Sequence, residues 1–139
     1  MKITKHEEIL KEVEQTINSA IKDKQGLLMH QRRLMSMISL GASNLIELYL
    51  HNLNVIDPGI SIKHNWFSKS KEKIKLKLDS ITSKNLNEIK NMHEIIGLIN
   101  QIEQDRNEII YGAPVTDKVL RRKIDAYLEL KKLCDYETD

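Results

Sequence analysis

Apolar residues recur along this chain at steps of three and four, the spacing that places side chains on one face of an α-helix. The first such stripe consists of Ile9, Leu10, Val13, Ile17, Ala20 and Ile21 and stops before Gly26, so we predict a helix over residues 5–24. A second segment, residues 27–54, carries apolar residues on more than one face. That breadth is typical of a helix at the centre of a bundle or in a subunit interface.

The middle of the chain has a weaker pattern. Asp57-Pro58-Gly59 is a turn signal, because proline presets one turn position and glycine tolerates the next. The stretch through Trp66 and Phe67 shows no period, and we predict a loop whose two aromatics pack against the bundle. Lysines then alternate with other residues from Lys69 to Lys77. A lone strand would have no partner here, so we predict a helix over residues 69–82.

A third long stripe runs over residues 86–111 and stops at Tyr111-Gly112, with Pro114 beyond. We interpret Gly112 as a helix-ending residue in the left-handed conformation. The pattern resumes over residues 117–134. The sequence thus predicts an all-α, up-and-down helical bundle of about five helices, over residues 5–24, 27–54, 69–82, 86–111 and 117–134, in a single domain spanning residues 1–139.

Composition supports this fold class. The chain has 139 residues, a length that suits one domain with a sizeable core. Six aromatics, two prolines and five glycines leave little material for a turn-rich β-fold. The net charge of +2 is too small to identify a nucleic-acid-binding protein by charge alone.

Targeting signals and cysteine chemistry are missing from the sequence. Cys134 is the single cysteine, which excludes an internal disulfide framework and a multi-cysteine metal site. No apolar signal-peptide core follows Met1-Lys2, and the sequence contains no uncharged apolar run of about 18 residues. We therefore expect a cytoplasmic protein that does not associate with a membrane.

Familiar catalytic and cofactor motifs are also missing. The histidines at positions 6, 30, 51, 64 and 93 form no His-Glu-x-x-His motif, and there is no Gly-rich phosphate loop or Gly-x-Ser-x-Gly elbow. We therefore predict no metal and no cofactor. The lysines at 69 to 77 are suited to phosphate contacts, although a solvated helix face is the commoner meaning of such a pattern.

The segment that ends the fourth predicted helix carries the strongest candidate chemistry. Arg106 can pair with a phosphate as a bidentate fork, and the amide of Asn107 beside it can orient a bound group. A simpler interpretation is that Arg106 offsets the negative end of the helix dipole or pairs with Glu103 one turn back.

The segment Arg106-Asn107-Glu-Ile-Ile-Tyr111 resembles the signature of the HEPN superfamily, in which an Arg and a polar residue precede a His by four to six positions. The stretch from residue 33 to residue 51 is similar to the long second helix of HEPN toxin-type proteins, with Glu47 as the acidic residue and His51 as the histidine one turn later. Many HEPN proteins are metal-independent RNases that dimerise across a cleft. There a histidine takes the 2′-hydroxyl proton and an arginine stabilises the phosphate charge.

This chain departs from the signature because Tyr111 stands where the histidine is expected. A phenol is a poor general base at neutral pH, although it can donate a hydrogen bond or stack on a base. Three functions stay open: RNA or nucleotide binding with weak or lost cleavage, an active metal-independent ribonuclease that uses His51 or His93 as its base, and a non-catalytic interaction module.

The resemblance also implies a site and partners. The predicted catalytic residues are Arg106, Asn107 and Tyr111, with His51 as a further candidate, and the predicted binding residues are Arg106, Asn107, Tyr111 and Glu47. The implied partners are RNA, a second copy of the chain in a homodimer, and a nucleotidyltransferase-type protein of a toxin–antitoxin system.

Overall fold

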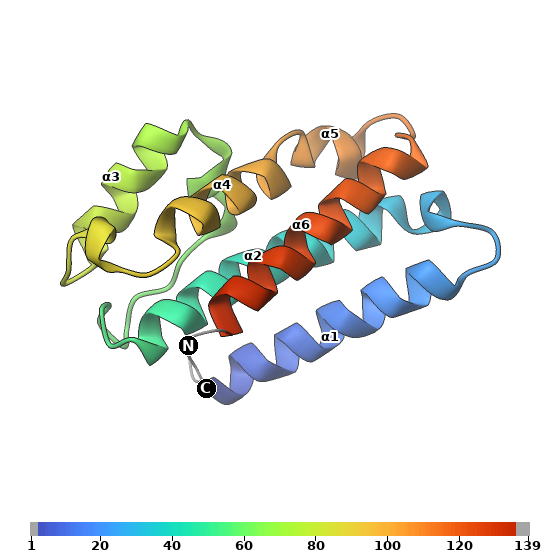
Figure 1. Ribbon diagram of the computed structural model, residues 1–139. Coiled ribbons are helices and arrows are strands. Elements are labelled where there is room, and N and C mark those ends of the chain that lie inside the picture. The colour runs from blue at the N-terminus through green and yellow to red at the C-terminus, as the bar shows by residue number, and fades with distance from the viewer. Residues whose placement is uncertain (1–2, 136–139) are drawn as a thin grey trace.

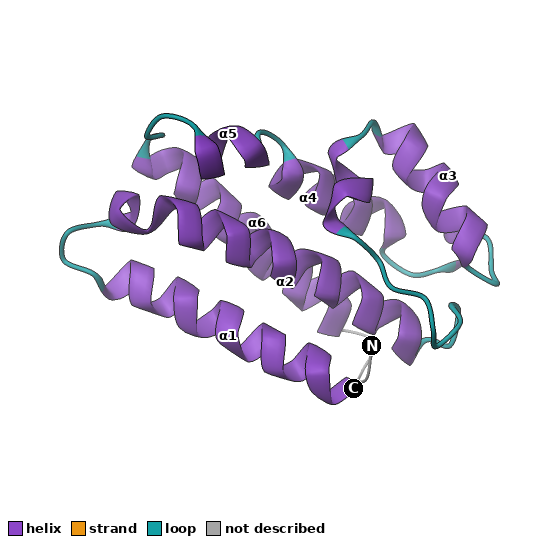
Figure 2. Ribbon diagram, turned by 180° about the vertical axis from the view of Figure 1, so that it is seen from behind, coloured by secondary structure: helices purple, strands orange, loops and turns teal. Residues whose placement is uncertain are grey.

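The computed structural model describes residues 3–135, with side chains from residue 5 onward. The α-helices are α1 (Ile3–Lys22), α2 (Gln31–Asn52), α3 (Lys71–Ile81), α4 (Met92–Glu103), α5 (Arg106–Tyr111) and α6 (Asp117–Asp135), with the 3-10 turns η1 (Leu27–His30), η2 (His64–Ser68) and η3 (Leu86–Glu88). Figures 1 and 2 show the long helices lying side by side. The described residues contain no strand, only a single β-bridge between Ile56 and Thr82. The predicted all-α helical bundle is confirmed.

Helix α2 lies at the centre of the bundle and contacts α1, α4, α5 and α6. Figure 1 shows α1 and α6 running along it. Gly41 allows this close packing, because a Cβ there would lie 2.8 Å from Tyr127 Cε1 of α6 and 3.0 Å from Val13 Cγ1 of α1. Neighbours within the same chain therefore account for the apolar breadth of this segment.

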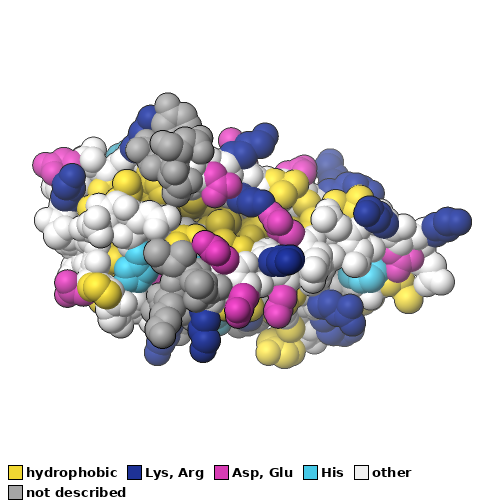
Figure 3. All heavy atoms as spheres, turned by 90° about the horizontal axis from the view of Figure 1, so that it is seen from below, with side chains coloured by type: hydrophobic (Ala, Val, Ile, Leu, Met, Phe, Trp, Pro, Cys, Tyr) yellow, Lys and Arg dark blue, Asp and Glu magenta, His cyan; other side chains and the backbone are white. Residues whose placement is uncertain are grey.

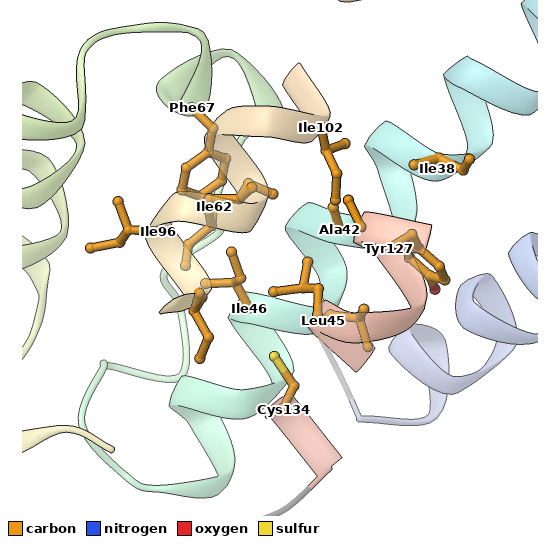
Figure 4. Packing of buried hydrophobic residues seen from close by; sticks show 14 of the residues in the cluster. Ile38, Ala42, Leu45, Ile46, Ile62, Phe67, Ile96, Ile102, Tyr127 and Cys134 are labelled. Atoms are coloured by element: carbon orange, nitrogen blue, oxygen red, sulfur yellow. The ribbon is translucent and has the colours of Figure 1, made fainter. Parts of the chain in front are cut away.

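The core is one cluster to which α1, α2, α4, α6 and the loop around η2 contribute. Figure 4 shows side chains of α2, α4 and α6 meeting between the helices. Phe67 of η2 is fully buried and Trp66 is partly buried against the core, so both loop aromatics pack inward as predicted. Their packing holds η2 against α4.

Helix α3 lies at the outer edge of the bundle and contacts α4 and η2 (Figure 1). Ile74 and Leu78, one turn apart, are buried, whereas Leu76 is 71% exposed. This one-sided burial confirms the predicted helix, since a strand would place residues 74, 76 and 78 on the same face. The Ser70 side chain caps the helix by accepting a hydrogen bond from the Lys73 backbone N–H at 3.3 Å.

The helix predicted over residues 86–111 is divided in three by two residues in the left-handed conformation, Asn91 (φ 65°) and Asp105 (φ 60°). The first break separates η3 from α4 and the second separates α4 from α5. At the second break, the buried Lys123 of α6 donates from Nζ to the carbonyl oxygens of Gln101 (2.7 Å), Ile102 (3.1 Å) and Gln104 (2.6 Å). A cation from another helix thus satisfies carbonyls that a continuous helix would have paired itself.

Gly112 ends α5 for a different reason than the one predicted. Its φ is −97°, so it does not adopt the left-handed conformation. A Cβ at this position would collide with the Glu108 carbonyl oxygen one turn earlier. Glycine is required here because the preceding turn of the same helix leaves no room for a side chain, not because φ is positive.

Charged and hydrophobic side chains are mixed on the surface of the protein. The face seen from below in Figure 1 carries positive and negative side chains interspersed around exposed hydrophobic ones (Figure 3). A search of residues 3–135 for a helix both long and apolar enough to cross a bilayer finds none.

Candidate functional site

Arg106 is the first residue of α5, directly after the break at Asp105, and its side chain reaches back to α2. Arg106 Nε donates a hydrogen bond to Ser39 Oγ (2.9 Å), and Ser39 Oγ donates to Glu103 Oε1 (2.6 Å). Arg106 Nη1 donates to Asn107 Oδ1 (2.9 Å), and Nε lies 3.9 Å from Glu103 Oε2. These contacts orient the guanidinium and realise the predicted pairing with Glu103.

A hollow of about 310 Å³ lies beside this group. We call it the Arg106 hollow, and it is lined by His64, Asn65, Ser68, Glu103, Gln104, Asp105, Arg106, Asn107 and Glu108. His64 belongs to η2, and its Nδ1 lies 3.9 Å from Glu103 Oε2. The volume is at the lower end of the range for small-molecule sites.

Burial and charge tune the titratable groups of the Arg106 hollow. Burial lowers the pKa of His64, and the nearby positive charge of Arg106 lowers it further. Burial raises the pKa of Glu103, which the hydrogen bond from Ser39 and the charges of Arg106 and Lys123 partly oppose. A lowered pKa keeps the His64 imidazole neutral at pH 7 and able to accept a proton.

The Arg106 hollow on its own is a weak anion site. Asp105 and Glu108 line it together with Glu103, so three carboxyl groups face one arginine. An anion held by Arg106 therefore needs additional positive charge from a neighbouring surface.

That positive charge lies next to it. A hollow of about 570 Å³ is lined by Asn65, Trp66, Lys69, Lys73, Leu76, Lys77 and Ser80, and we call it the lysine hollow. Lys77 Nζ lies 4.7 Å from the centroid of the Trp66 ring, a cation–π distance. Asn65 lines both hollows. Asn100 of α4 fixes the intervening turn by donating from Nδ2 to the carbonyl oxygens of Phe67 (3.1 Å) and Lys69 (2.9 Å).

The structure places Glu47 and His51 in a different group from Arg106. Ser39, which contacts Arg106, is eight residues before Glu47 on α2, a rise of about 12 Å along the helix. Glu47 Oε2 lies 2.7 Å from His6 Nε2 of α1 and 4.0 Å from His51 Nε2, and Glu47 Oε1 accepts from the Ile62 N–H at 2.5 Å. Arg106 and the pair Glu47 and His51 thus belong to two clusters at different positions along the axis of α2.

The other predicted residues lie on the surface. Asn107 is exposed and lines the Arg106 hollow, whereas Tyr111 at the end of α5 is 79% exposed and does not line it. Five residues of helix turn Tyr111 by about 140° from Arg106 around α5. His93, exposed in the first turn of α4, lies in neither hollow.

Sequence reasoning missed Ser39 and His64 as partners of Arg106. Ser39 is one small polar residue in a long apolar segment, and His64 lies in the stretch without a period, so neither position carried a signal. In comparisons with known proteins, no family model, no curated protein and no solved structure matches this chain.

Proposed function

We propose that this protein binds single-stranded RNA across the lysine hollow and the Arg106 hollow, as a HEPN-like domain with Tyr111 in place of the motif histidine. The observation that carries the proposal is that Asn65 lines both hollows. A surface of three lysines and a tryptophan therefore continues into the site that holds Arg106. Positive charge beside an aromatic ring is a common combination in single-strand binding.

Each hollow has a distinct role in this proposal. Lys69, Lys73 and Lys77 neutralise successive phosphates and supply most of the affinity, since phosphate contacts dominate nucleic-acid binding. Trp66 offers the exposed part of its ring to a base. Arg106 binds one phosphate with the guanidinium N–H groups that Ser39 and Asn107 do not use, since an arginine has five such donors.

Cleavage of the bound strand is a second candidate function, favoured by the position of His64. This histidine lies in the same hollow as Arg106 and has a lowered pKa. A neutral His64 would take the proton of a ribose 2′-hydroxyl, whose oxygen would form a bond to the adjacent phosphorus while Arg106 stabilised the charge on the phosphate. The bond from phosphorus to the 5′-oxygen would break, the 5′-oxygen would take a proton from the imidazolium or from water, and a 2′,3′-cyclic phosphate would remain. In this scheme His64 takes the role that the HEPN resemblance assigned to a motif histidine, and the reaction needs no metal.

Further predictions rest on the HEPN resemblance. They are a homodimer, a nucleotidyltransferase-type partner and a toxin–antitoxin setting. The alternative of a non-catalytic interaction module predicts a folded protein with no affinity for RNA at either hollow. Measured RNA affinity therefore distinguishes an RNA-binding domain from a non-catalytic interaction module.

The test compares lysines on two sides of the same helix. The double variant Lys73→Ala/Lys77→Ala removes charge from the lysine hollow, whereas Lys75→Ala removes an exposed charge of α3 outside it. Binding of a fluorescein-labelled single-stranded RNA is followed by anisotropy at several salt concentrations. We expect the double variant to bind more weakly and its salt slope to fall by about 0.7 for each lost contact. Equal affinity for wild type, Lys75→Ala and the double variant would reject the proposal.

A further inference from the structure

The second cluster on α2 has the composition of a metal site. One ring nitrogen of His6, one of His51 and one carboxylate oxygen of Glu47 lie within 4.8 Å of one another. His6 and Glu47 are buried, and the His51 side chain is 12% exposed. Two imidazoles and one carboxylate from two helices thus converge on one point inside the protein.

Hydrogen bonds behind the cluster fix how the ligand atoms face it. Asn44 Nδ2 donates to the Leu40 carbonyl oxygen at 2.8 Å, which sets the amide orientation and leaves Asn44 Oδ1 facing His6. His6 Nδ1 therefore carries a hydrogen and donates it to Asn44 Oδ1 at 2.7 Å. The other nitrogen, Nε2, points at Glu47 Oε2. Metal-binding histidines are commonly oriented in this way, with the second ring N–H donated to an oxygen.

The carboxylate is held in the same manner. Glu47 Oε1 accepts a hydrogen bond from the Ile62 backbone N–H at 2.5 Å, and Oε2 faces both histidines. Glu47 and His51 are one helical turn apart on α2, so the two side chains lie on one face of the helix. Only His6 must be supplied by another helix, and α1 delivers it.

A buried ion pair between His6 and Glu47 is the simpler explanation, and it accounts for only part of the cluster. A second proton on His6 would satisfy the 2.7 Å contact between His6 Nε2 and Glu47 Oε2. It would leave His51 Nε2, a buried atom with no hydrogen-bond partner among the described residues, unsatisfied. A cation bonded to both nitrogens and to the carboxylate satisfies all three atoms at once.

We propose that His6, Glu47 and His51 bind one divalent transition-metal ion, with Zn²⁺ as the first ion to test. Two imidazole ligands favour zinc and its neighbours over Mg²⁺ and Ca²⁺, which prefer oxygen ligands throughout. Zinc bonds of about 2.0–2.2 Å place ligand atoms about 3.4 Å apart, between the 2.7 Å and 4.0 Å contacts of Glu47 Oε2. Small rotations of the side chains therefore close the site, and the ion joins α1 to α2.

The test is titration of the full-length, chelator-treated protein with ZnCl2 by calorimetry. We expect one ion per chain, and His51→Ala should weaken binding by more than about 100-fold, since it removes a ligand itself and loss of a ligand's outer partner alone costs about 10-fold to 100-fold. His93→Ala, which removes an exposed histidine elsewhere, should bind zinc like wild type. Asn44→Ala should weaken zinc binding by about 10-fold to 100-fold, because the orientation of His6 is lost.

A second measurement covers the case in which a variant does not fold. Glu47→Gln keeps the size of the side chain and its capacity to accept from Ile62, and circular dichroism checks its helicity. Wild-type protein loaded with Co²⁺ should show visible absorption bands of a nitrogen- and oxygen-ligated ion, and Glu47→Gln should not. Zinc affinity equal in wild type and His51→Ala, or no saturable binding by wild type, would overturn the proposal and leave a buried ion pair.

Discussion

Helix α2 carries two polar clusters that use the same kinds of residue in opposite surroundings. Near Ser39, the cluster of Arg106, Glu103 and His64 borders a hollow, and the His64 side chain is 44% exposed. Near Glu47, the cluster with His6 and His51 is closed in the core. Each cluster contains histidine and glutamate, so residue type alone does not separate them.

The surroundings of each cluster determine what its side chains can do. A histidine beside an open hollow can exchange protons with a ligand, and the ligand can bind and dissociate without disturbing the core. A histidine sealed against a glutamate is part of the folded structure, and its loss leaves other buried polar atoms without a partner. We therefore propose that the open cluster binds RNA and that the closed one, with its proposed metal ion, joins α1 to α2.

The greatest loss of stability is expected from a substitution in the closed cluster. His6→Ala removes the hydrogen bond of Asn44 and one contact of Glu47 in the core, so we expect it to lower the free energy of unfolding by about 3 kcal/mol. His64→Ala should change it by no more than about 0.5 kcal/mol, as for most surface sites. Urea denaturation of the two variants measures both values. Equal losses of stability would contradict the division into an open and a closed cluster.

The second effect concerns the break that positions Arg106. Lys123→Met keeps the apolar stem but removes the ammonium that binds three carbonyl oxygens at the end of α4. We expect a loss of about 2 kcal/mol of stability, measured by chemical denaturation. Lys118→Met, on the exposed side of α6, is the control and should leave stability unchanged. If both variants were equally stable, Lys123 would not be holding the end of α4.

The third effect concerns binding in the open cluster. Arg106→Ala should weaken RNA binding about tenfold, in line with one charge-assisted contact. Arg121→Ala is the matched control, because Arg121 is exposed on α6 and pairs with Asp117 at 2.6 Å. Anisotropy titrations compare the two variants, with circular dichroism to confirm that each is folded. Identical affinity in both would place the RNA away from Arg106.

The smallest effect concerns the titration of His64. Because the Arg106 charge helps to lower the pKa of His64, Arg106→Ala should raise that pKa, though burial will still hold it below the ordinary value. NMR titration of the imidazole signals measures the shift. A pKa lowered on folding means that the folded protein binds fewer protons than the unfolded chain, so stability begins to fall below pH 6.5 and continues to fall until the pH passes the lower pKa of folded His64. Cleavage with His64 as base should decline as the pH falls towards the pKa of folded His64. If the pKa of His64 were the same in Arg106→Ala as in wild type, the Arg106 charge would not act on the His64 imidazole.

The fold was largely predictable because helical burial repeats with a regular period. The predicted helix over residues 69–82 is an instructive case, since the lack of a partner strand favoured a helix and the burial of Ile74 and Leu78 confirms it. The division of residues 86–111 was not predictable. Nothing near Asp105 in the sequence indicates that Lys123, 18 positions later, will cap α4 from another helix.

The site was predictable only where its parts are close in sequence. Arg106 and Asn107 are neighbours, and the structure brings them together. His64 and Ser39 reach Arg106 through tertiary packing, so no spacing rule could find them. The closed cluster shows the same limit, because His6 meets Glu47 across 41 positions of chain and two helices.

The most direct test of the central claim uses Trp66, the only tryptophan in the sequence, which lies in the lysine hollow. Its intrinsic fluorescence should change saturably as single-stranded RNA is added, because stacked bases and bound phosphates alter its surroundings. The change should need far more RNA in Lys73→Ala/Lys77→Ala and moderately more in Arg106→Ala. RNA binding detected by anisotropy without any change in Trp66 fluorescence, or no RNA binding at all, would contradict the account.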